Sequence, residues 1–136
     1  MLLLLGLKDA ELSILFVNDR QMKELNHKYR GIDRTTDVLS FPQYSATVQK
    51  RKSTKVKSLY ASALLRFCAS ALVLGDVVIN LQAVKRQAPE HGLKFGEELQ
   101  WLLVHGVLHL IGYDHERSKY AERKMRAKER ELLAHI

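Results

Sequence analysis

The sequence predicts an α+β domain in which helices pack on a small mixed β-sheet. Short apolar runs rich in strand formers are interspersed with segments whose apolar residues recur at helical spacing. These segments follow one another in the order strand, helix, two strands and three helices. A chain of 136 residues with 46% hydrophobic content can bury one core. We therefore expect a single domain over residues 1–136, without internal repeats.

A change of period marks the first strand and the first helix. The run LSILFV (12–17) is short, apolar and rich in strand formers. Asn18, which follows it, can cap a helix. In RQMKELNHKYR (20–30) the apolar residues recur at steps of three and four, and Gly31 is a typical helix stop. This stretch predicts a strand followed by a helix.

Two further strands and a helix are expected in the middle of the chain. TDVLSFP (36–42) is a second strand candidate, and GDVVIN (75–80) is a third. LQAVKRQAPEHG (81–92) favours a helix that ends near Pro89 and Gly92.

The last two helices differ in character. EELQWLLVHGVLHLIG (97–112) is apolar on nearly every side, so we expect this helix to be buried, with Gly112 as its stop. SKYAERKMRAKERELLAHI (118–136) is rich in helix formers. The residues available for its contact face are Ala121, Met125, Leu132, Leu133 and Ile136.

An atypical segment at about 44–73 fits none of these elements. Its first half is basic and polar, and its second half is a run of Ala, Ser and Leu without a clear period. Between Gln43 and Leu74 there are six basic residues and no acid, against 16 basic and 15 acidic residues elsewhere. Almost all of the net charge of +7 therefore lies in one segment.

Composition excludes several classes of protein. Cys68 is the only cysteine, which rules out intrachain disulfides and cysteine-rich zinc modules. The opening MLLLLGLKDAELS lacks the basic start of a secretory or transit peptide, and Arg66 breaks the longest apolar run. We expect a soluble, cytoplasmic protein without membrane contact.

The segment HGVLHLIGYDH (105–115) contains three of the six histidines of the chain. His105 and His109 are four apart on the predicted helix, so both project from one face, and Gly112 lets the chain turn back with His115. Three imidazoles suit zinc and leave one coordination position open. Unpartnered imidazoles would be costly in so apolar a helix, which disfavours three unrelated core or surface histidines. His27, His91 and His135 have no partners at useful spacing, and we expect them at the surface.

The spacing also fits the long zinc-protease signature His-Glu-x-x-His-x-x-Gly-x-x-His, so we expect a metzincin-like zinc helix. One position differs. Gly106 stands where those proteases have the glutamate that takes a proton from zinc-bound water.

Together with YRGIDRTTDVLSFP (29–42) and LGDVVI (74–79), this segment resembles the YbeY endoribonucleases, bacterial ribosomal-RNA maturation factors. The resemblance covers roughly residues 11–43 and 74–133. It implies a zinc-dependent, single-strand-specific endoribonuclease of small-subunit (16S) ribosomal RNA maturation and ribosome quality control, in the cytoplasm. Its partners would be single-stranded or ribosomal RNA, the small ribosomal subunit and associated assembly factors. By motif position, one zinc ion per chain would be bound by His105, His109 and His115, and Arg30 would be the functional arginine.

The chain departs from the family in starting close to its first strand, in TTDV at 35–38 and in the segment at about 44–73.

Asp114 either orients a ligand imidazole or accepts hydrogen bonds from turn amides. Cys68 is expected to be an apolar filler. The basic residues at 50–57 either form a solvated loop or hold the RNA backbone, and we expect the second; they are Lys50, Arg51, Lys52, Lys55 and Lys57. The alternatives are a zinc peptidase-like hydrolase whose base comes from elsewhere, and a non-catalytic assembly factor with structural zinc.

Overall fold

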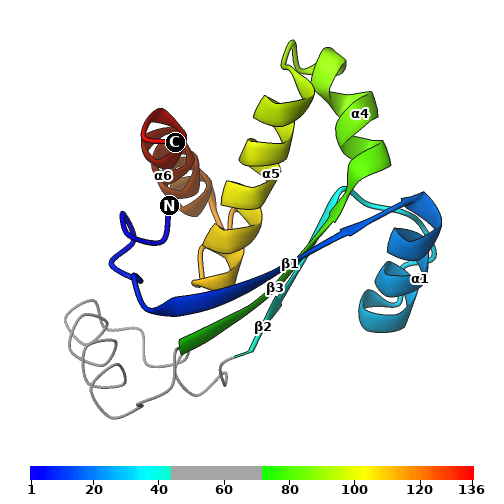
Figure 1. The fold of residues 1–136 in the computed structure, drawn as a ribbon, viewed down its shortest axis with the longest axis horizontal. Coiled ribbons are helices and arrows are strands. Elements are labelled where there is room, and N and C mark those ends of the chain that lie inside the picture. The colour runs from blue at the N-terminus through cyan, green and yellow to red at the C-terminus, as the bar shows by residue number, and fades with distance from the viewer. Residues whose placement is uncertain (44–71) are drawn as a thin grey trace.

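The computed structural model describes residues 1–43 and 72–136 and has an α+β fold (Figure 1). Within these residues the order is strand, helix, two strands and three helices, which confirms the predicted class. The elements are β1 (Ala10–Val17), α1 (Asp19–Arg30), β2 (Val38–Pro42), β3 (Leu72–Asn80), α4 (Leu81–Glu90), α5 (Phe95–Leu110) and α6 (Lys119–Ala134).

The three strands form one mixed sheet in the order β1-β3-β2. β1 runs parallel to the central strand β3, whereas β2 runs antiparallel to it. Successive side chains of a strand point to opposite faces. Val78 therefore joins Met22 of α1 in one cluster, while Val77 and Ile79 join Leu102 of α5 in another. The sheet separates α1 from α5.

Local signals fix both ends of α1. Asn18 accepts a hydrogen bond from the backbone N–H of Gln21, whose side chain accepts one from the backbone N–H of Asn18, as in a capping box. Gly31 ends the helix in the left-handed region at φ 68°. Both ends were predicted from the residue types.

α5 lies on the face of the sheet opposite α1 and packs against the sheet, α4 and α6 (Figure 1). One side contacts β2, where the Ser40 hydroxyl donates to the Gly106 carbonyl at 3.0 Å. Another side meets α6 through a buried cluster of Val104, Leu108, Met125 and Leu132. From Leu102 to Leu110 no residue of α5 is exposed, which confirms the burial predicted for this helix.

Two helices differ in detail from the sequence prediction. α5 begins at Phe95, two residues earlier than predicted, whereas Gly112, which follows the C-cap Ile111 at φ 96°, is confirmed as its stop. Ile136 lies beyond α6 and is 54% exposed, so its assignment to the contact face was wrong.

The five basic residues at 50–57 and Cys68 lie outside the described residues. In the part of the chain that is described, no helix combines the length and apolarity needed to cross a membrane.

Candidate metal centre

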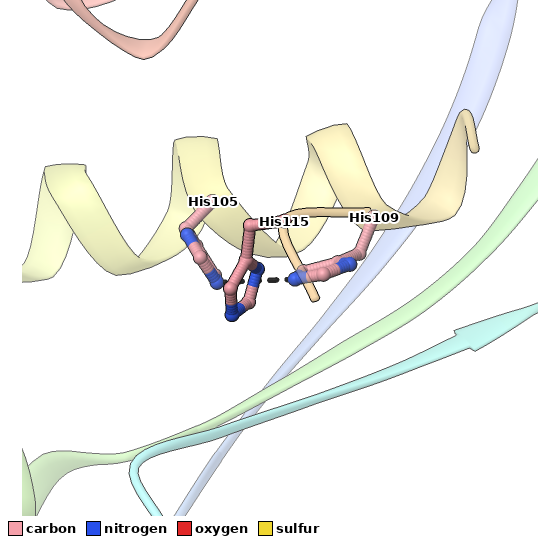
Figure 2. A group of neighbouring side chains, drawn as sticks. All are labelled: His105, His109 and His115. Atoms are coloured by element: carbon pink, nitrogen blue, oxygen red, sulfur yellow. Dashed lines mark hydrogen bonds between the residues drawn. The ribbon is translucent and has the colours of Figure 1, made fainter. Parts of the chain in front are cut away.

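Three histidines converge on one flank of α5 (Figure 2). His105 and His109 lie one turn apart on this helix, and the turn after it brings His115 back toward them. Gly112 makes that turn possible, because its φ of 96° disfavours a residue with a side chain. Ring centroids are separated by 4.7 Å for the first pair, and those two rings lie 5.2 and 5.1 Å from His115. The sequence prediction that these three residues meet is confirmed.

Two hydrogen bonds engage both ring nitrogens of His105. His105 Nδ1 lies 2.7 Å from Glu129 Oε1, and His105 Nε2 lies 3.1 Å from His109 Nε2. A protonated Nδ1 that donates to the carboxylate leaves a lone pair on Nε2 of His105. The Nε2–H of His109 then donates to that lone pair. Only the proton of this hydrogen bond lies between the Nε2 atoms of His105 and His109, and the two atoms are positioned to bind one cation together.

Burial and crowding favour the uncharged rings that a metal requires. Desolvation lowers the pKa of His109, and the proximity of His105 and His115 lowers it further. Nδ1 of His115 is buried without a hydrogen-bond partner. Nitrogens from all three rings lie within 4.8 Å of one another. The orphaned nitrogen and this set of three imidazole donors fit a borderline divalent metal such as zinc.

Glu129 is the residue of this site that sequence reasoning missed. It comes from α6, 24 residues from His105, and is only 6% exposed. Met125 and Leu132 bury the helix face on either side of it. A glutamate inside the apolar face of the predicted last helix was the available signal, because a buried carboxylate needs a partner. A carboxylate hydrogen-bonded to a ligand imidazole is a common feature of zinc sites.

Gly106 faces the sheet rather than the histidines. A Cβ atom there would lie 2.7 Å from Val77 Cγ1 and 3.2 Å from Ser40 Oγ. The glutamate found at this position in zinc proteases would therefore collide with the sheet. The packing of α5 on β2 and β3 explains the glycine that distinguishes this segment from the protease signature.

A second histidine–carboxylate pair lies next to the cluster. Nδ1 of His91 lies 2.9 Å from Oε2 of the fully buried Glu98, and this hydrogen bond raises the pKa of His91. Trp101 lies between the two sites, with its ring centroid 6.3 Å from that of His91 and 5.3 Å from that of His105. The expectation that His91 is exposed holds, but the expectation that it lacks a partner was wrong.

Of the two other candidate residues, Arg30 lies away from the three rings, whereas Asp114 directly precedes His115. Arg30 is the exposed last residue of α1, on the other side of the sheet from α5, and has no hydrogen bond or ion pair within the described residues. Asp114 accepts a hydrogen bond from the backbone N–H of Glu116 at 3.0 Å and lies 3.6 Å from the Arg117 guanidinium. The roles predicted for both residues remain predictions.

The chain is similar to characterised sequences over nearly its whole length. Residues 4–136 match the family described as Endoribonuclease YbeY. The chain is 43% identical over 130 residues to Endoribonuclease YbeY of Pelotomaculum thermopropionicum, covering 95% of this chain and 74% of that protein. It is 39% identical over 125 residues to Endoribonuclease YbeY of Thermodesulfovibrio yellowstonii, covering 92% and 66% respectively.

The fold is also similar to that of a solved structure. The solution structure of TM1509 from Thermotoga maritima superposes with a TM-score of 0.59 at 27% identity. The match covers 97% of this chain and 71% of that one. The matched residues thus span about two thirds to three quarters of these longer proteins.

Proposed function

Since the chain belongs to the YbeY endoribonuclease family, we propose that it is a zinc-dependent, single-strand-specific endoribonuclease. We place its action in small-subunit (16S) ribosomal RNA maturation and ribosome quality control, in the cytoplasm. The observation that carries the metal dependence is the convergence of three imidazoles backed by a buried carboxylate. The partners that follow are ribosomal RNA, the small ribosomal subunit and its assembly factors.

His105, His109 and His115 would hold one zinc ion through neutral rings. When bound, zinc supplies a Lewis acid that polarises a phosphodiester oxygen. Glu129 keeps the proton of His105 on Nδ1, so that Nε2 faces the other two rings. Asp114 accepts a hydrogen bond from the backbone N–H of Glu116 across His115, and would thereby fix where that ring returns to the cluster.

Arg30 is proposed to neutralise the phosphate during cleavage, because it stands at the functional arginine position of the family. Arg30→Ala should keep zinc and fold while lowering RNA cleavage by a factor on the order of 10². Arg30→Lys should restore little, since an ammonium cannot reproduce the planar fork of a guanidinium. Unchanged turnover in Arg30→Ala would assign this exposed residue no part in the reaction.

The basic residues Lys50, Arg51, Lys52, Lys55 and Lys57 are proposed to hold the RNA backbone. Replacing all of them with Gln should weaken RNA binding and lower its salt dependence by about 0.7 per lost phosphate contact, with zinc content unchanged.

One comparison separates the three functional classes. Zinc-loaded wild type and His109→Ala are incubated with a single-stranded RNA, with its duplex and with casein. We expect the wild type alone to cleave, and only the single strand. Casein cleavage would indicate the peptidase-like alternative. Tight zinc binding without cleavage of either substrate would indicate an assembly factor with structural zinc.

A further inference from the structure

α6 has a strongly uneven distribution of charge around its axis. The helix contains six basic and three acidic residues. At 3.6 residues per turn, four of the basic residues fall within about 60° of one another and form a line about 17 Å long. This line, which we call the basic row, consists of Lys119, Arg123, Arg126 and Arg130, all of them exposed.

Neighbouring acids that the structure describes neutralise only one of the four cations of the basic row. Within the described part of the chain, only Arg126 has an ion pair, with Glu122 at 2.6 Å on the surface. The Arg123 guanidinium donates to the backbone carbonyl of Lys119. Of the other two acids of α6, Glu129 points inward to His105, and Glu131 pairs with Lys128 outside the row.

Helix stability does not account for the row. Lys119 is the first residue of α6, where a cation opposes the helix dipole. Lys119 with Arg123, and Arg126 with Arg130, are like charges four residues apart, which destabilise a helix. Each effect costs a few tenths of a kcal/mol. Four cations in this arrangement are better explained by an anionic partner.

The row lies beside the face of α6 that contacts the candidate metal centre. Met125 and Leu132 define the buried side of the helix, and Glu129 projects from the edge of that side. By helix geometry, the row begins about 60° beyond Glu129, on the side away from the buried residues. A polymer lying at the histidines would therefore meet the row next.

We infer that the basic row binds consecutive phosphates of single-stranded RNA beside the metal centre. This inference rests on the proposed function and adds a surface to it. One guanidinium group can donate two parallel hydrogen bonds to two oxygens of a phosphate, and three of the four cations are arginines. An open line of charges fits a linear polyanion, and its binding releases counterions from the strand.

Two double variants of equal charge test the inference. Arg123→Gln with Arg130→Gln removes two charges of the row, and Lys124→Gln with Lys128→Gln removes two from another side of the same helix. The full chain without zinc is titrated against a labelled single-stranded RNA at several KCl concentrations. The row variant should bind roughly tenfold more weakly, with a salt slope lower by about 1.4 for two lost contacts. The Lys variant should bind as the wild type does, and thermal melting should be alike in all three.

Three outcomes would overturn the inference: equal weakening in both double variants, no weakening in the row variant, or no RNA binding by the wild type. If the row variant no longer binds an acidic poly-glutamate peptide but still binds RNA like the wild type, the row would be assigned to a protein partner instead. Because binding is measured without zinc, it is independent of cleavage. Loss of cleavage alone would contradict the proposed function and leave the row in place.

Discussion

At the scale of single residues, the candidate metal centre includes a carboxylate that contacts a histidine ring rather than supplying one of the three grouped nitrogens. Glu129 is almost fully buried, and in the described structure its hydrogen bond goes to His105. A buried carboxylate without such a bond would be costly, so the pair stabilises the contact of α6 with α5 as well as the ring orientation. Because Nδ1 of His105 is committed to this bond, only Nε2 remains for a metal.

Replacing Glu129 should therefore weaken zinc binding without touching a ligand. Glu129→Ala is expected to lower zinc affinity by about 10- to 100-fold, since nothing then holds His105 in its tautomer and orientation. Glu129→Gln should recover part of the loss, because its amide oxygen still accepts from Nδ1–H. Chelator competition measures the affinities. Glu131→Ala, an exposed acid on the same helix, is the control and should bind zinc like the wild type.

At the scale of elements, α5 serves two surfaces at once. Its Gly106 side lies on the sheet, and on its histidine side His105 is hydrogen-bonded to Glu129 of α6. A helix that exposes so little of its surface tolerates few added atoms. The spacing of the histidines and the absence of a side chain at position 106 are therefore parts of one arrangement.

Gly106→Ala should destabilise the fold by about 1–3 kcal/mol, because the added methyl group enters a packed interface. The displaced atoms would belong to Val77 and Ser40. Gly96→Ala, in the first turn of the same helix, is the matched control, since its Cβ would meet no atom within 4 Å. Its stability should be equal or slightly higher, because Ala favours the helix. Urea denaturation measures both, and equal stability of the two variants would contradict the packing argument.

The corner between α4 and α5 should be sensitive to pH. The Glu98 hydrogen bond raises the pKa of His91, aided by the nearby charges of Glu90 and Asp37. A raised pKa means that the stabilisation is fully present below the unfolded value of about 6.5 and is lost as pH rises through the folded pKa. His91→Gln should therefore lower the urea midpoint more at pH 6 than at pH 9. His27→Gln, an exposed histidine of α1, should show no such difference. A deficit in His91→Gln that is independent of pH would contradict the ion pair.

At the scale of the whole molecule, the sequence predicts what depends on neighbours along the chain and misses what depends on distant residues. The two ends of α1, at Asn18 and Gly31, follow from local spacing, and so does the meeting of the three histidines within eleven residues. The contact of Glu129 with His105 does not, because it depends on how α6 crosses α5. The basic row was hidden for a similar reason. Outside the segment at about 44–73, a count of 16 basic against 15 acidic residues does not reveal that four cations of α6 fall on one side of this helix.

The site joins elements that are separate in the unfolded chain, so zinc should stabilise the whole fold. His105 and His109 belong to α5, His115 to the turn after it, and Glu129 ties α6 to the same centre. A ligand that binds only the folded state adds about 2.7 kcal/mol at one hundred times its Kd, which corresponds to roughly 10 °C in Tm for a chain of this size. His115→Ala should lose most of that shift, because two imidazoles from one helix no longer fix the following turn. His27→Ala should keep it, and magnesium should not replace zinc, since it prefers oxygen ligands. Calorimetry with and without each metal measures the shifts. An equal zinc shift in His115→Ala and His27→Ala would show that zinc stabilises this chain at some other site.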